Sequence, residues 1–303
     1  MKKLTGRKNV WSPKQLIDGF LHHNELKILT GSSQDIAGLH KSVYEKFQIP
    51  HKSDRYFFVY NKQNPAKHQL DLQEINLSGG ELLFVVPNQI HTSPPLKKGL
   101  EFHSLSFESS CLSLLPRQFP FLTNPFNKQT ISFDKESKQR VVAIFATLRL
   151  LLFSDRTRNN TEIILAHLNT LLTEFNNAYF KNTSIEIFSG NKLSKYIQFK
   201  LLIEAEFKKQ PGVNSIAKKL VLSENQLYSI VKEFSGLSPK KYLIRRLILE
   251  AQRILVYERP IVKELAYELG FADPDYFSRL FKQHTGKSVS RFVNYIQDLS
   301  SQK

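Results

Sequence analysis

The stretch that decides the fold is SENQLYSIVKEFSGLSPKKYL at residues 223–243, which recurs fifty positions later as DPDYFSRLFKQHTGKSVSRFV at residues 273–293. Upstream of these segments the match continues with an offset of forty-nine. The turn between the two matching parts therefore differs by one residue between the copies. The aligned pairs share their chemistry: Ser223 with Asp273, Leu227 with Phe277, Ile230 with Leu280, Val231 with Phe281, Lys232 with Lys282, Gly236 with Gly286, Ser238 with Ser288 and Tyr242 with Phe292. The repeat predicts two copies of one structural unit.

Each copy has the pattern of a helix, a tight turn and a second helix. In the second copy, apolar residues at i, i+3, i+4 and i+7 predict one buried helical face: Val262, Leu265, Ala266 and Leu269. Gly270 follows, and glycine takes the positive φ that ends many helices. Asp273 is a favourable N-cap with Pro274 at the first helical position, and Ser223 is the corresponding N-cap in the first copy. Both second helices are therefore expected to begin sharply.

The polar faces of these second helices are the candidate DNA-reading surfaces. A helix-turn-helix protein places its second helix in the major groove, where Asn bridges adenine, Arg bridges guanine, and Lys or Tyr holds phosphate. The alternative is that these are solvated faces of an ordinary helical domain. The outward residues are Asn225, Tyr228, Ser229 and Lys232 on the first helix, and Asp275, Tyr276, Arg279, Lys282 and Gln283 on the second.

Residues 239–258 (PKKYLIRRLILEAQRILVYE) carry apolar residues on one helical face and predict a long connecting helix. Such a helix is a spacer between the two units. Two second helices held on one face would enter successive major grooves if they lie about 34 Å apart, which is one turn of B-DNA.

The stretch from about 195 to 295 resembles the DNA-binding domain of the AraC/XylS family of transcription regulators. The matching segments are SIAKKLVLSENQL, GLSPKKYL, LEAQRIL and ELAYELGFADPDYFSRLFKQHTGKS. One position departs from the family pattern, because Val289 stands where the second copy usually has proline, whereas the first copy keeps Ser238-Pro239. The resemblance implies binding to double-stranded promoter or operator DNA, contact with RNA polymerase, and a homodimer.

Charge and cysteine content agree with this interpretation. The chain has a net charge of +16, and residues 191–303 contain 20 Lys and Arg against 11 Asp and Glu, as phosphate contact requires. A single cysteine, Cys111, excludes a disulfide framework, a cysteine-based zinc finger and the metal-binding DNA-repair methyltransferases that carry a similar unit. No signal peptide or eighteen-residue apolar run is visible. We expect a cytoplasmic protein without membrane contact.

The first half predicts short strands and a sensor domain. Strands are expected at residues 55–60, 70–77, 81–86 and 100–107, with Ser78-Gly79-Gly80 as a tight turn. HKSDRYFFVYNK and LSGGELLFVVPNQIH resemble the cupin-like sensor barrels of the same family. An effector pocket inside the barrel is expected to be lined by Tyr56, Phe58 and Tyr60 or by their strand neighbours.

A metal site is not expected in this barrel. Metal-binding cupins need a His-x-His pair, a nearby carboxylate and a distant third histidine, whereas His51, His68, His91 and His103 each stand alone. His22 and His23 would point to opposite faces of a strand. Neither a metal nor another cofactor is therefore predicted.

Residues 134–180 predict two helices with apolar stripes, separated by the loop SDRTRNNT at 154–161. One stripe comprises Val141, Ile144, Phe145, Leu148, Leu151 and Leu152, and the other comprises Ile164, Leu168, Leu171 and Phe175. Either the stripes cover the barrel as core, or residues about 141–175 form the contact of a homodimer. The family resemblance favours the dimer.

Together these patterns predict an α+β protein, with a cupin-like β-barrel and a helical hairpin followed by an all-α domain with two helix-turn-helix motifs. The expected domains are 1–180 for sensing and dimerisation (barrel about 20–125, helices about 134–180), a linker at 181–192, and a DNA-binding domain at 193–303. The predicted function is non-catalytic, sequence-specific transcription regulation controlled by a small molecule or partner. The alternatives are a cupin-type enzyme tethered to DNA and an architectural DNA-binding protein.

Overall fold

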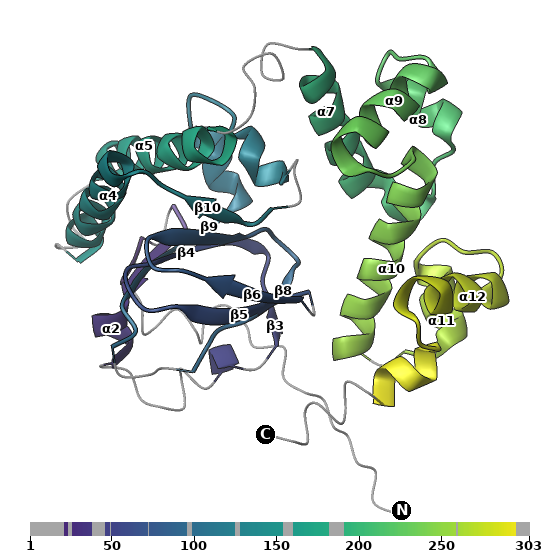
Figure 1. The fold of residues 1–303 in the computed structure, drawn as a ribbon, viewed down its shortest axis with the longest axis horizontal. Helices are drawn as coiled ribbons and strands as arrows, with labels where there is room; N and C mark the ends of the chain where they lie inside the picture. The colour runs from purple at the N-terminus through teal and green to yellow at the C-terminus, as the bar shows by residue number, and fades with distance from the viewer. Residues whose placement is uncertain are drawn as a thin grey trace, which may run out of the picture. The chain divides into compact units, whose positions relative to one another are not determined.

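The computed structural model describes residues 21–23, 26–37, 46–48, 50–71, 73–95, 99–124, 128–153, 160–181, 191–258 and 260–294. The chain forms two compact units, the first ending at Thr183 and the second beginning at Ser184. Strands occur in the first unit, and the second is built of helices (Figure 1). Residues 182–190, most of the expected linker, lie outside the described residues.

The first unit contains two antiparallel sheets. The larger has the order β1 (Leu21–His23), β2 (Ile28–Ser32), β9 (Phe102–Glu108), β4 (Arg55–Asn61), β7 (Glu81–Val85) and β10 (Thr130–Ser132). The smaller has the order β3 (His51–Lys52), β8 (Ile90–Thr92), β5 (Ala66–Leu70) and β6 (Gln73–Leu77). Among the described residues no ladder joins the two sheets, so the expected closed barrel is corrected to an open pair of sheets.

The expected strand at residues 70–77 is also corrected. The structure places a turn within it, so that β5 ends at Leu70 and β6 begins at Gln73. Asp71 lies in this turn with a φ of 48°, a left-handed conformation that aspartate tolerates better than most residues. Its carboxylate accepts hydrogen bonds from the backbone N–H of Ile90 and the side chain of Gln89, which ties the turn to β8.

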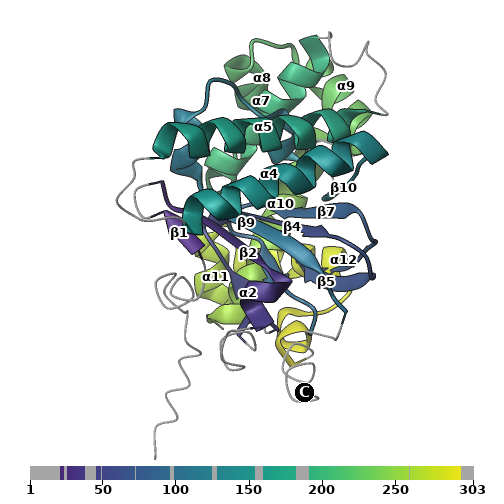
Figure 2. The same cartoon turned by 90° about the vertical axis from the view of Figure 1, so that its left-hand side faces the viewer.

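Two helices, α4 (Lys135–Phe153) and α5 (Thr161–Phe180), cover one face of the larger sheet (Figure 2). The sheet presents aromatic rings to them: Phe58 lies 5.5 Å from Phe175 between ring centroids, and Tyr60 lies 6.4 Å from Phe145. Burying rings of this size accounts for much of the stability of a domain. This layer of rings is the core between the helices and the sheet.

The apolar stripe of α5 belongs to this core. Ile164, Leu168, Leu171 and Phe175 are each fully buried within the first unit. Of the two roles expected for the stripe, the structure therefore supports core packing, and the prediction that it forms a dimer contact is wrong. The exposed large apolar residues of the two helices are Leu150 and Ile163, which lie elsewhere on their surfaces.

The second unit begins with α7 (Asn191–Glu206) and the short helix η4 (Phe207–Lys209). The repeated part follows as α8 (Val213–Lys219), α9 (Glu224–Ser235), α10 (Pro239–Tyr257), α11 (Val262–Glu268) and α12 (Pro274–Thr285). The 19-residue α10 is about 28 Å long at 1.5 Å per residue. It is the expected connecting helix between the two helix-turn-helix copies.

A partly buried ion network links α7 to α10. Arg246 donates to both carboxylate oxygens of Glu204, at 2.8 and 2.9 Å, and to Glu250 at 2.9 Å. Its guanidinium also lies over the ring of Phe207, 4.1 Å from the centroid. Because α7 precedes the repeat, this network extends the unit beyond the two copies. No helix in the described part of the chain is long and apolar enough to span a membrane.

Candidate nucleic-acid interface and effector cavity

The two copies have matching turn geometry. Val221 in the first and Gly270 in the second both have positive φ, 55° and 79°, directly after the first helix of each motif. The backbone N–H of the next residue donates to the carbonyl oxygen five residues earlier in both copies. Leu222 donates to Ala217 at 3.0 Å, and Phe271 donates to Ala266 at 2.9 Å. The repeat in sequence is thus a repeat in backbone conformation.

Both second helices are capped at the same relative positions. Ser223 forms a capping box with Gln226 at the start of α9, and Asp273 accepts from the backbone N–H of Asp275 at the start of α12. These bonds satisfy backbone donors that the first helical turn leaves without partners. At the other end, Gly236 and Gly286 have φ of 71° and 72° and bond back to the lysine four residues earlier, each at 2.9 Å.

The departure at Val289 leaves the following turn unchanged. Ser238 accepts from the N–H of Lys241 at 3.3 Å in the first copy, and Ser288 accepts from that of Arg291 at 3.3 Å in the second. Val289 is buried, as is Pro239 at the same position of the first copy. Proline at this position favours a helix start but is not needed once serine caps the helix.

The apolar stripes of both second helices face inward. Leu227, Ile230 and Val231 are buried on α9, and Phe277, Leu280 and Phe281 are buried on α12. The opposite faces are exposed and carry every residue predicted to meet DNA: Asn225, Tyr228, Ser229 and Lys232 on α9, and Asp275, Tyr276, Arg279 and Lys282 on α12. Each set follows helical spacing, so each forms one continuous outward face.

Local contacts hold the long cationic side chains along these faces. The Lys232 ammonium lies 5.7 Å from the centroid of the Tyr228 ring, and the Arg279 guanidinium lies 5.9 Å from that of Tyr276. Arg279 also reaches Asp273 at 3.7 Å, but it is 69% exposed. An ion pair so exposed contributes little to stability.

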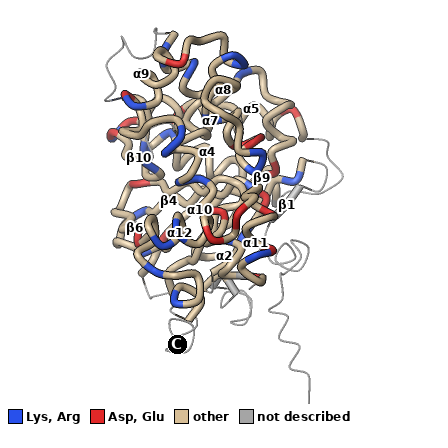
Figure 3. The backbone as a smooth tube through the Cα atoms, turned by 90° about the vertical axis from the view of Figure 1, so that its right-hand side faces the viewer, with Lys and Arg blue, Asp and Glu red and all other residues tan. Residues whose placement is uncertain are grey.

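Figure 3 shows the lysine and arginine positions along the backbone in blue. In the second unit many of them lie in or beside the two motifs: Lys218, Lys219, Lys232, Lys240, Lys241, Arg279, Lys282, Lys287 and Arg291. Lys219 is paired with Glu206 at 2.5 Å. A basic surface around two exposed reading faces has the charge that a phosphate backbone attracts.

The helix-turn-helix domain family matches residues 216–295, which span both motifs and α10. Residues 216–295 form an AraC-type helix-turn-helix domain. The chain is 25% identical to the Msm operon regulatory protein of Streptococcus mutans over 247 residues, which cover 81% of this chain and 86% of that protein. It is 30% identical to the transcriptional activator RhaS of Citrobacter koseri over 124 residues, covering 41% of this chain and 42% of RhaS.

The chain is also similar to ToxT from Vibrio cholerae, in a crystal structure with an unsaturated fatty acid bound. The match covers 80% of this chain and 87% of the ToxT chain, with 15% sequence identity and a TM-score of 0.42. The similarity to RhaS covers less than half of each chain, whereas the similarity to the Msm regulator also extends outside the AraC-type domain. RhaS is a transcriptional activator, and the Msm protein is an operon regulatory protein.

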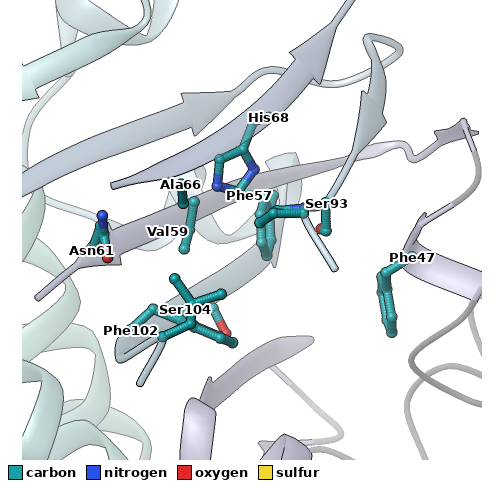
Figure 4. Close-up of a pocket in the computed structure, with 11 residues that line it drawn as sticks. Phe47, Phe57, Val59, Asn61, Ala66, His68, Ser93, Phe102 and Ser104 are labelled. Carbon is teal, nitrogen blue, oxygen red and sulfur yellow. The ribbon is translucent and has the colours of Figure 1, made fainter. Parts of the chain in front are cut away.

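The first unit contains an inner cavity between its two sheets, of about 50 Å³ (Figure 4). Its lining is mostly apolar and is contributed by both sheets: Phe47, Phe57, Val59, Asn61, Ala66, His68, Ser93, Pro94, Leu100, Phe102 and Ser104. A cavity of this size holds a few water molecules, so a larger ligand would enter only if the walls moved.

Of the two faces of β4 that could line an effector pocket, the one formed by the strand neighbours of Tyr56, Phe58 and Tyr60 faces the inner cavity. Because side chains alternate along a strand, Phe57, Val59 and Asn61 line the inner cavity, whereas Phe58 and Tyr60 point toward α4 and α5. Tyr56 contacts Phe107 at 5.4 Å between ring centroids. The strand neighbours, and not Tyr56, Phe58 and Tyr60 themselves, form the cavity wall.

Asn61 contributes a buried polar group to this wall. Its amide nitrogen donates to the carbonyl oxygens of Asn64, Leu77 and Ser78 at 2.6, 3.1 and 3.3 Å, which fixes the orientation of the amide. Its Oδ1 atom is buried and has no donor among the described residues. A buried oxygen without a hydrogen-bond donor lowers the stability of the fold, so it is a candidate for a role in binding.

Three histidines that stand apart in the sequence lie together on the smaller sheet. The strand register places His51 opposite His91, and Nδ1 of His68 lies 3.0 Å from Nε2 of His91. Burial lowers the pKa of His68 to about 4 and that of His91 well below its ordinary value. Two neutral rings share a hydrogen bond here. The described residues include no group of three or more ligands arranged to hold a metal ion.

Proposed function

We propose that the protein is a sequence-specific DNA-binding transcription regulator of the AraC/XylS type, whose first unit controls the second. The observation that carries this proposal is the pair of exposed polar faces on α9 and α12, each on the second helix of a motif with the same caps and turns. Such faces fit the major groove, where side chains reach base edges. This role places the protein in the cytoplasm with the DNA it reads.

The α12 face gives the sharper specificity. Arg279 is the one arginine on either predicted reading face, and arginine is the side chain that bonds both N7 and O6 of guanine. We propose that Asn225, Tyr228 and Ser229 on α9 tune the other half of the site. Lys232 and Lys282 are assigned to phosphate, because lysine binds as a point charge without a fixed fork of donors.

The first unit is assigned to ligand sensing. Its inner cavity, with the acceptor of Asn61 and the polar edge of His68, is one candidate effector site. A homodimer remains part of the proposal, with the exposed surface of α5 around Ile163 replacing the buried stripe as its contact. Contact with RNA polymerase is proposed from the similarity to transcription activators.

Selection of binding sites from random duplex DNA tests the function. The wild-type chain should enrich one sequence, and Arg279→Ala should lose preference at one base pair, with a cost of roughly 1–3 kcal/mol if the contact is bidentate. Lys282→Ala is the matched control, because it removes a charge from the same helix and should weaken all sequences alike. Failure of the wild-type chain to enrich any sequence would contradict the proposal, and an equal loss on all sequences for Arg279→Ala would reassign that residue to phosphate.

A further inference from the structure

A second, larger cavity of about 370 Å³ lies on the helix-facing side of the larger sheet. It is separate from the inner cavity, because Phe102 and Ser104 line the inner one whereas His103, which points to the other face of β9, lines this one. Residues from β2, α2 (Ser33–Ala37), β9 and α4 form its walls. A volume of this size falls in the range of small-molecule sites, which begins at about 300 Å³.

Two cations converge on this outer cavity. Lys62 enters from the end of β4, and its ammonium lies 3.9 Å from the carboxylate of Glu101, an open and weak pairing. Arg149 enters from α4 and donates to both carboxylate oxygens of Asp35, on α2, so that one edge of its guanidinium is engaged. A guanidinium has five N–H donors, so Arg149 keeps donors beyond those two bonds.

His103 lines the same cavity as these two cations. Its ring is stacked on Phe145 at 5.3 Å, with an angle of 12° between the ring planes. Its Nε2 atom is buried and has no hydrogen-bond partner among the described residues. Burial lowers the pKa of His103 to about 4, and Lys62 and Arg149 lower it further against the opposing effect of Asp35. Both cations therefore lie near enough to act on this ring, and the carboxylates of Asp35 and Glu101 lie beside them.

We propose that this outer cavity binds a small organic anion, with a carboxylate or phosphate group held between Lys62 and Arg149. The neutral His103 can donate one N–H to an anionic oxygen, whereas the hydroxyl of Ser32, in the same wall, already donates to Asp35 at 2.7 Å. Ala146 and Leu150 on α4 supply an apolar side for the rest of the molecule. Leu150 is 68% exposed, so a ligand that covered it would also remove apolar surface from water.

The site joins two elements that are linked by an ion pair. Asp35 belongs to α2 and Arg149 to α4, and an anion beside Arg149 would share its guanidinium with Asp35. Ligand binding would thus change the strength of the α2–α4 contact. This regulatory step rests on the proposed function, whereas binding itself can be measured without DNA and succeeds or fails independently.

The test uses the full-length chain with sodium phosphate and sodium acetate as probes, at ionic strength kept constant with sodium chloride. Thermal unfolding and calorimetric titration should show saturable binding to at least one of the two anions. The anion that binds more tightly distinguishes a phosphate-bearing ligand from a carboxylate. Lys62→Gln should weaken that binding roughly tenfold, the effect expected for loss of one charge-assisted hydrogen bond.

Lys67→Gln is the matched control. Lys67 is also a paired lysine of the first unit, bound to Glu74 at 2.8 Å, but it is 70% exposed and does not line the outer cavity. Its loss should leave anion binding unchanged. Imidazole nitrogen resonances give a second readout: the signal that His103→Gln removes should shift when the wild-type chain binds the anion. Absence of saturable binding, or equal weakening by the two lysine substitutions, would overturn the proposal.

Discussion

Replacement of Gly270 by alanine should destabilise the AraC-type domain far more than replacement of Gly286, although both glycines have positive φ near 75°. A Cβ atom at Gly270 would lie 2.0 Å from the carbonyl oxygen of Lys208, whereas a Cβ atom at Gly286 would meet no heavy atom within 4 Å. The two substitutions therefore share the cost of left-handed backbone, about 1 kcal/mol. They differ in the steric overlap between the new Cβ atom and the Lys208 carbonyl oxygen, which occurs at Gly270 and not at Gly286.

Relief of that overlap requires movement of backbone. Lys208 belongs to η4, and the turn after it is tied to the same place, because Gln210 donates through Nε2 to the carbonyl oxygen of Leu269 at 3.0 Å. Overpacking of this kind costs roughly 1–3 kcal/mol. Gly270→Ala should thus lower the free energy of unfolding by about 2–4 kcal/mol, and Gly286→Ala by about 1 kcal/mol.

Val221 gives a third substitution of opposite sign. It occupies the position of Gly270 in the first copy with a φ of 55°, and its side chain is 83% exposed. Val221→Gly removes left-handed strain and no buried contact, so it should stabilise the domain by up to about 1 kcal/mol despite the greater freedom of glycine when unfolded. Urea unfolding of residues 184–303, followed by far-ultraviolet circular dichroism, measures all three. Equal losses for Gly270→Ala and Gly286→Ala would refute the reasoning.

Three further predictions concern salt, the N-terminal core and pH. DNA affinity should fall steeply as salt increases, because lysines such as Lys218, Lys240 and Lys241 displace counterions from phosphate; a log–log slope near zero in fluorescence anisotropy would contradict this. Replacing Leu168 and Leu171 by aspartate should unfold the first unit and leave the second folded, because both side chains are fully buried; a folded, monomeric double variant, shown by light scattering and circular dichroism, would restore the dimer role of the stripe. The pKa of His68 in the folded state is about 4, below its ordinary value of 6.5, so the unfolded chain binds more protons between these pH values. The contribution of His68 to the free energy of unfolding is therefore complete above pH 6.5 and is lost as the pH falls toward 4, by about 3 kcal/mol at most. His68→Gln should flatten that dependence in thermal unfolding, whereas His167→Gln on α5 should not; identical pH profiles for the two variants would remove His68 as the cause.

The sequence by itself determined the second unit. Helix spacing, caps and turn glycines are local properties, so the repeat at 223–243 and 273–293 sufficed to predict both motifs, the connecting helix and the outward faces of Asn225 and Arg279. Even the departure at Val289 had little effect, because the capping serine beside it is also local.

Only the tertiary structure decided the organisation of the first unit. A strand has two faces, and alternation along β4 does not say which one meets the helices, so the sequence leaves open that Phe57 and Val59, and not Phe58 and Tyr60, line the cavity. An apolar stripe on α5 fits either a core or a partner, and the rings of the sheet made it core. The clusters His51–His68–His91 and Lys62–His103–Arg149 arise from strand register and helix packing across long sequence separations, which no local pattern records.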